Sequence, residues 1–147
     1  MNDNLIKRND GSELDVDWVM SQTANTSAIE RRATTLGARR SIKKDHQAAW
    51  LLRAISCIDL TTLSGDDTEG RVRRLCAKGI RPIRPDLTRA LGITNLHVGA
   101  ICVYHEMIGA AITALGNSGI PVAAVSTGFP AGLSPLSTRL LEINESV

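Results

Sequence analysis

The sequence predicts an α/β fold with a parallel sheet, because three strand-like apolar runs alternate with helix-like stretches. The runs are residues 55–63 (ISCIDLTTL), 98–104 (VGAICVY) and 122–127 (VAAVST). Each run is apolar and rich in β-branched residues, and each ends in polar or reactive groups, as buried parallel strands do when they deliver side chains to a site at their carboxyl ends. Strands joined through helices lie parallel and are covered on both faces, so we expect the opening part of a β/α barrel.

Capping and helix-breaking residues place helices around these strands. We expect one helix that Asn25, Thr26 or Ser27 caps and that runs to about Leu36, where Gly37 ends it. Another helix is expected to start at Asp67 or Thr68 and to run to about Lys78. Further helices are expected over the ranges 85–92 and 106–115 and after the pair Ser134-Pro135. Residues 1–54 are therefore predicted to form a helical N-terminal extension, and residues 55–147 the first three β/α units of an incomplete TIM barrel.

The rival architecture is an open, doubly wound sheet. The dinucleotide-binding form of that sheet would need the spacing G-x-G-x-x-G after the first strand, and residues 64–70 (SGDDTEG) do not supply it. We therefore expect neither a nicotinamide nor a flavin site, and no other cofactor.

Composition sets the class of protein. The 147 residues are enough for one domain with a core, although a complete β/α barrel takes about 250. The chain is 43% hydrophobic and 22% charged, as in ordinary globular proteins, and its net charge of +2 argues for neither a nucleic-acid nor a membrane partner. The N-terminus is polar, so we expect a cytoplasmic protein without a secretory signal.

Three cysteines, Cys57, Cys76 and Cys102, form an odd set without C-x-x-C spacing. We expect reduced thiols and neither a disulfide nor a metal site. Cys57 and Cys102 fall within predicted buried strands.

Six basic side chains gather ahead of the first predicted strand. Such a cluster could contact nucleic acid or phosphate, but charge runs on helices are usually solvated faces, so we expect no nucleic acid here. The cluster consists of Arg31, Arg32, Arg39, Arg40, Lys43 and Lys44.

Three motifs, in this order, resemble deoxyribose-phosphate aldolase, a class I aldolase family built on a β/α barrel. They are CIDLTTLSGDDT at residues 57–68, GAICVY at 99–104 and VSTGFPAG at 125–132. Residues 41–68 are especially similar to the longer, animal-type members, which carry a helical extension before the first strand. The resemblance covers the chain from about residue 11 to 147.

The resemblance implies a lyase with a sugar-phosphate substrate. The family cleaves 2-deoxy-D-ribose 5-phosphate reversibly to glyceraldehyde 3-phosphate and acetaldehyde, through a Schiff base on a lysine whose pKa must fall towards neutrality.

Three positions carry the family pattern into this chain. Asp59 matches an aspartate of the proton and hydrogen-bond network; from its residue type alone, it could equally cap the following loop. Thr61 matches a position in the sugar pocket, or it is a turn threonine that bonds local backbone. Cys102 matches a cysteine near the reacting carbon, or it is a small buried apolar residue.

The Schiff-base lysine is expected to be absent. The family places it on the sixth strand, whereas this chain has Lys7, Lys43, Lys44 and Lys78, all at helix ends or in the polar terminus. Two hypotheses follow: the sequence is the N-terminal portion of an aldolase, or it is a non-catalytic product that acts as a binding or interaction module.

In either hypothesis, the third strand would leave a row of unpaired backbone groups. We expect an unstable chain, or association through this open sheet edge, including association between copies.

His105 departs from the family pattern, which usually has proline after the second strand. Proline would start the next helix cleanly, so His105 is expected to loosen that start. As a general base it would have only the adjacent, poorly placed Glu106 as a partner.

Overall fold

The computed structural model describes residues 13–39 and 41–146. The chain divides into two compact units with a boundary between Ser41 and Ile42. None of the helices in the described ranges is long and apolar enough to cross a membrane.

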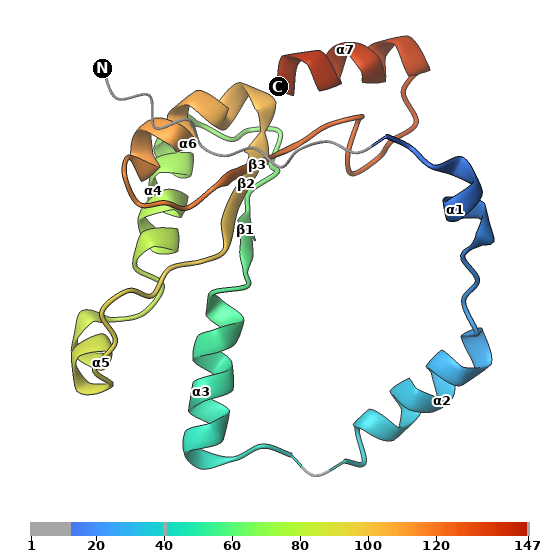
Figure 1. The fold of residues 1–147 in the computed structure, drawn as a ribbon. Helices are drawn as coiled ribbons and strands as arrows, with labels where there is room; N and C mark the ends of the chain where they lie inside the picture. The colour runs from blue at the N-terminus through green and yellow to red at the C-terminus, as the bar shows by residue number, and fades with distance from the viewer. Residues whose placement is uncertain (1–12, 40, 147) are drawn as a thin grey trace. The chain divides into compact units, whose positions relative to one another are not determined.

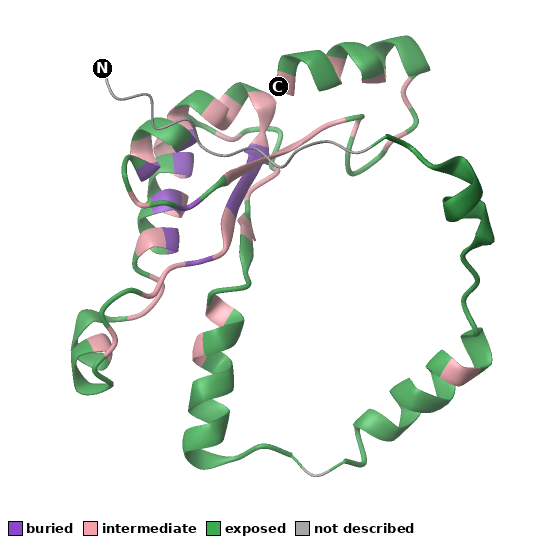
Figure 2. Ribbon diagram, viewed as in Figure 1, coloured by how far each residue is buried: buried purple, intermediate pink, exposed green. Residues whose placement is uncertain are grey.

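The first unit holds two short helices, α1 (Val16–Ser21) and α2 (Thr26–Leu36). Asn25 caps α2, because its side chain accepts a hydrogen bond from the N–H of Ala28 at 3.0 Å, and Gly37 follows the last residue. The prediction for this helix is confirmed. Neither helix buries a residue (Figure 2), so local hydrogen bonds, including the caps, are the interactions that the structure gives for this unit.

The second unit alternates helices and strands (Figure 1). Its elements are α3 (Lys44–Ile55), β1 (Asp59–Thr61), α4 (Glu69–Ile80), α5 (Pro85–Ala90), β2 (Ala100–Tyr104), the 3-10 turn η1 (His105–Met107), α6 (Ile108–Leu115), β3 (Val122–Val125) and α7 (Leu136–Ser146). The strands form one parallel sheet in the order β1-β2-β3, which confirms the predicted α/β class and strand direction.

The first predicted strand is largely wrong in its extent. Ile55 ends α3, and the N–H groups of Cys57 and Ile58 bond back to the carbonyls of Ala54 and Ile55 at 3.0 and 3.1 Å. The apolar stripe of the helix runs into the apolar strand, and hydrophobicity alone does not separate two such segments. Cys57 is consequently exposed rather than buried in a strand.

The core lies between the sheet and two helices, α4 and α6. Figure 2 shows the buried positions on β2 and on these helices. Gly79 permits the close approach of α4 to β2, since a Cβ atom there would lie 2.7 Å from Cδ1 of Ile101. The buried cluster consists of Val72, Cys76, Val98, Ile101, Val103, Ala111, Leu115 and Ile120.

The expectation that both faces of every strand are covered is wrong at β1. Leu60 packs against the core, whereas Asp59 and Thr61, on the opposite face, are exposed. Only one face of this strand is therefore used for packing among the described residues.

Candidate functional site

Strand register brings the three predicted site residues to one face of the sheet. Thr61 pairs with Cys102 across the β1-β2 ladder, and Asp59 lies two residues before Thr61 on the same face. Together they line a cavity of about 400 Å³. The complete lining is Asp59, Thr61, Leu63, Cys102, Val125, Ser126 and Phe129, so all three strands contribute.

Thr61 joins local and cross-strand contacts. Its hydroxyl donates to the carbonyl oxygen of Asp59 at 3.1 Å, which is the local backbone bond that a turn threonine makes. Thr61 also lies directly across from Cys102 in the ladder, and its side chain lowers the pKa of the Cys102 thiol. The side chain thus lines the cavity and lies beside Cys102 of the neighbouring strand.

Cys102 is 7% exposed, and burial is the main cause that raises the pKa of its thiol. The negative charge of Asp59 raises this pKa further, and the neighbouring Thr61 side chain opposes the shift. Because a raised pKa keeps the thiol protonated at neutral pH, Cys102 offers the cavity a small, neutral, polarizable group rather than a nucleophilic thiolate.

Asp59 contributes a carboxylate that is open to solvent. The loop and helix that follow β1 are capped by other residues, Asp67 and Thr68, whose side chains accept bonds from Ser64 and Arg71. Asp59 is therefore available to a ligand of the cavity. In the described part of the chain, no three His, Cys, Asp or Glu side chains are grouped closely enough to hold a metal ion.

Sequence reasoning did not identify Ser126 as a site residue. Ser126 immediately follows β3, and its buried hydroxyl oxygen has no hydrogen-bond partner among the described residues. Thr127 and Gly128 then turn the chain with positive φ angles of 59° and 76°, and Gly128 donates its N–H to Glu142 of α7 at 2.7 Å. The signal was present, because Ser126 lies within VSTGFPAG at a strand end.

His105 lies in η1 and does not line this cavity. Helix α6 starts through that 3-10 turn without a side-chain cap. The Nδ1 atom of His105 is buried without a hydrogen-bond partner in the described ranges, and Glu106 is exposed.

Three of the four lysines lie on or beside helices. Lys43 precedes α3, Lys44 begins it, and Lys78 is in the last turn of α4. Lys7, and Arg40 of the basic cluster, lie outside the described residues. The remaining members of that cluster are exposed: Arg31, Arg32, Arg39, Lys43 and Lys44.

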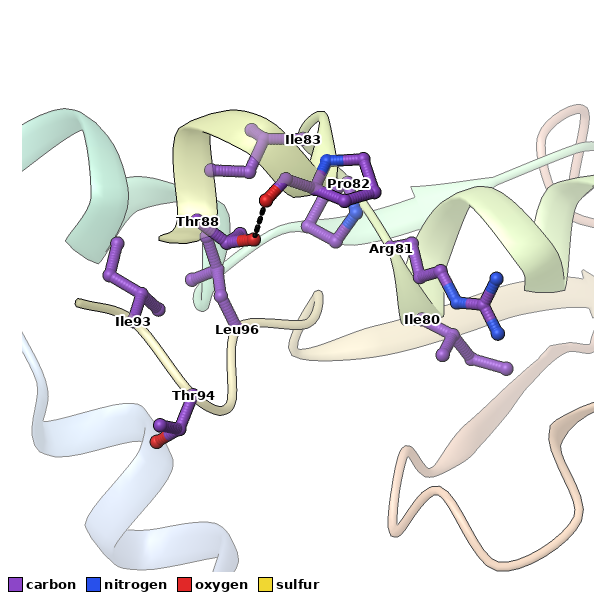
Figure 3. Close-up of a pocket in the computed structure, with 9 residues that line it drawn as sticks. Ile80, Arg81, Pro82, Ile83, Thr88, Ile93, Thr94 and Leu96 are labelled. Carbon is purple, nitrogen blue, oxygen red and sulfur yellow. Dashed lines mark hydrogen bonds between the residues drawn. The ribbon is translucent and has the colours of Figure 1, made fainter. Parts of the chain in front are cut away.

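A second cavity, of about 310 Å³, lies beside the end of α4 and around α5 (Figure 3). Its lining is mostly apolar, and the hydroxyl of Thr88 already donates to the carbonyl of Pro85 at 2.9 Å. Figure 3 shows the guanidinium of Arg81 directed away from Ile83 and Thr88. Because this cavity gathers no set of converging polar groups, we take the cavity at Asp59, Thr61 and Cys102 as the functional candidate.

Comparison with known proteins agrees with the motifs. No protein-family model matches the chain. It is 51% identical to the deoxyribose-phosphate aldolase of mouse over 141 residues, which cover 93% of this chain and 44% of the mouse protein. It is 50% identical to the cow protein over 141 residues, with the same two shares. With the human protein the identity is 49% over 147 residues, which cover 97% of this chain and 46% of the human one.

The chain spans about half the length of these relatives, as the shares of 44% and 46% state. The similarity extends over the predicted helical extension as well as the strands, since it covers 93% or more of this chain. Over nearly its whole length, the chain is a homologue of the deoxyribose-phosphate aldolases.

Proposed function

We propose that the cavity on the open face of the sheet, the face that Asp59, Thr61 and Cys102 share, is the sugar-binding half of a deoxyribose-phosphate aldolase site. In this proposal the chain supplies a helical extension, residues 1–54, and the first three β/α units of a β/α barrel, residues 55–147. The observation that carries the proposal is that Asp59, Thr61 and Cys102, which match the family motifs from two separate stretches of sequence, line one cavity of about 400 Å³.

Each residue then has a role that suits its chemistry. Thr61 supplies a hydroxyl that can exchange its bond to the Asp59 carbonyl for one to a sugar hydroxyl. Asp59, exposed on the strand, accepts a proton or a hydrogen bond from the substrate. Cys102 gives a neutral, close-fitting wall beside the reacting carbon.

The amine that forms the Schiff base would come from outside this cavity wall. No lysine is among the seven lining residues, and three of the lysines lie on or beside α3 and α4. A Schiff base needs an amine that a desolvated or cationic setting keeps neutral, and helix ends in water do not supply that setting.

Binding and turnover can be tested separately. We expect 2-deoxyribose 5-phosphate to bind the purified chain, and Thr61→Val to weaken that binding by about tenfold, the loss typical of one hydrogen bond to a buried partner. Leu91→Ala, on the exposed part of the fold after α5, is the matched control. If calorimetry detects no binding, or if both variants bind as the unaltered chain does, the proposed site is wrong.

A second candidate function is a non-catalytic binding module, and the lysine positions favour it. Incubation with acetaldehyde followed by borohydride reduces any Schiff base to a stable secondary amine. We expect mass spectrometry to find no single lysine that is modified preferentially. A specific adduct on one lysine would exclude this candidate and would support turnover by the chain itself.

Association through the sheet edge completes the proposal. Strand β3 pairs only with β2 among the described residues, so its other edge presents unpaired backbone groups, which other strands readily pair with. We expect light scattering to report dimers or larger species whose share rises with concentration. A monodisperse monomer with one sharp thermal transition would contradict this expectation.

A further inference from the structure

We infer that Asp67, which does not line the cavity, is a positioning residue that holds the β1 wall of the cavity in place. The inference rests on the proposed function to the extent that this cavity is the substrate site. Asp67 lies in the loop that joins β1 to α4, and its side chain bonds Thr62 and Ser64 of that loop.

The carboxylate of Asp67 is 4% exposed and is hydrogen-bonded on both oxygens. It accepts bonds from the hydroxyl of Thr62 at 2.9 and 3.0 Å, from the N–H of Ser64 at 3.0 Å and from the guanidinium of Arg71 at 3.1 Å. A buried carboxylate is costly unless it is paired in this way, so the bonds and the burial depend on each other.

These bonds fix the backbone on both sides of a cavity residue. Leu63 lines the cavity, and its two neighbours, Thr62 and Ser64, are both held by the one carboxylate. The N–H of Thr62 also donates to the carbonyl of Cys102 at 3.0 Å, which ties the same point to β2. Asp67 therefore acts on Thr61, Leu63 and Cys102 through Thr62.

The adjacent carboxylate of Asp66 provides a natural comparison. It is 74% exposed and bonds Arg71 and the Ser64 hydroxyl, and these partners lower its pKa to about 2. Asp66 is thus charged at neutral pH, lies in the same loop and shares the same arginine, but it bonds nothing in the cavity wall. Asp66→Asn removes a charge from the loop and leaves intact the bonds of Asp67 to Thr62 and Ser64, which together we call the clamp.

The variant Asp67→Asn keeps the size of the side chain but removes one acceptor. Whichever oxygen becomes an amide NH₂ group, that group then faces an N–H donor that cannot accept, because Oδ1 accepts from the guanidinium of Arg71 and Oδ2 from the N–H of Ser64. We expect the β1 wall to loosen and to uncover Cys102, which is 7% exposed in the intact structure.

Cysteine alkylation by iodoacetamide, quantified for each site by mass spectrometry, measures this change within one molecule. Cys57 is exposed and serves as the reference, and Cys76 lies in the core and reports global opening. In Asp67→Asn, we expect the Cys102 rate to rise about fivefold relative to Cys57, the size expected from one lost hydrogen bond, with Cys76 unchanged. In Asp66→Asn, all three rates should stay the same.

A second pair of variants tests the clamp from its other end. Thr62→Val removes the hydroxyl that donates a hydrogen bond to Asp67, and should reproduce the rise in the alkylation rate of Cys102. Thr62→Ser keeps the hydroxyl and should leave that rate unchanged. Equal Cys102 rates in Asp67→Asn and Asp66→Asn would overturn the inference. So would a parallel rise at Cys76, because it would mean that Asp67 supports the whole unit rather than one wall.

The same assay separates this inference from the proposed function. If the cavity binds the sugar phosphate, 2-deoxyribose 5-phosphate should slow the alkylation of Cys102 in the unaltered chain, and the protection should weaken in Asp67→Asn. Lack of protection in the unaltered chain would count against the proposed substrate site. The alkylation ratios of the variants without ligand would still decide whether Asp67 positions the wall.

Discussion

The two faces of the three-stranded sheet are put to different uses, and neighbouring residues of β2 make the contrast plain. Ile101 is fully buried against α4, whereas the next residue, Cys102, lines the cavity on the opposite face. Successive side chains of a strand point to opposite sides, so one short strand serves both faces. The packed face stabilises this unit through its buried contacts. The open face, which Asp59, Thr61 and Cys102 share, can present polar groups to a ligand.

The largest expected effect belongs to the packed face. Ile101→Ala removes a fully buried side chain that contacts the helices, and should lower the free energy of unfolding by about 2–5 kcal/mol. Urea denaturation followed by circular dichroism measures this change. Thr61→Ala, on the open face of the adjacent strand, is the control and should cost much less; equal losses would mean that the two faces are not distinct.

Cys76, in the core beside the packed face, and Cys102, on the open face, form a matched pair, for which we expect smaller losses of unfolding free energy than for Ile101→Ala. Cys76→Ser places a hydroxyl in the core, where the carbonyl that the sulfur now bonds, that of Ala111, is 3.9 Å away, so we expect a loss of about 1–3 kcal/mol. Cys102→Ser places its hydroxyl at the cavity, opposite Thr61 in the ladder, and should cost under about 1 kcal/mol. Thermal unfolding of the two variants gives the order, and the reverse order would refute the assignment of the faces.

Sequence patterns predicted the helices with clear caps and the direction of the strands. Asn25, Gly37 and Thr68 act as expected, because their capping bonds are local and each is written within a few residues. The first strand was overextended, because Ile55 satisfies a helical stripe as well as a strand. Helix-end bonds back to Ala54 and Ile55 decide the boundary, and apolar character does not encode them.

The candidate site was predictable only where motifs carried it. Asp59, Thr61 and Cys102 were named from motif resemblance, and the strand register that joins them depends on pairing between segments about 40 residues apart. The clamp of Asp67 on Thr62 and Ser64 could not be read from the sequence, since SGDDTEG contains two adjacent aspartates. Their burial and their hydrogen-bond partners in the fold distinguish them: the side chain of Asp67 is 4% exposed and that of Asp66 is 74% exposed.

Charge on the open face should change the chemistry of its cysteine without changing the fold. The carboxylate of Asp59 helps to raise the pKa of Cys102, so Asp59→Asn should lower that pKa. A lower pKa gives more thiolate at a given pH, and the alkylation profile of Cys102 should shift towards lower pH while that of Cys57 does not move. Rates measured between about pH 7 and 10, around the ordinary cysteine pKa, test this, and an unchanged profile would show that Asp59 does not act on the thiol.

The smallest effect on stability is expected at Thr61 itself. Thr61→Val keeps the β-branched shape that a strand favours and removes only an exposed hydrogen bond to the carbonyl of Asp59, so the free energy of unfolding should change by less than about 0.5 kcal/mol. The same variant should weaken sugar-phosphate binding, whereas Thr61→Ser should restore it. In Thr61→Val, calorimetry should therefore show a lower affinity while urea denaturation shows an unchanged free energy of unfolding. A loss of both together would mean that the open face, like the packed one, is built for stability.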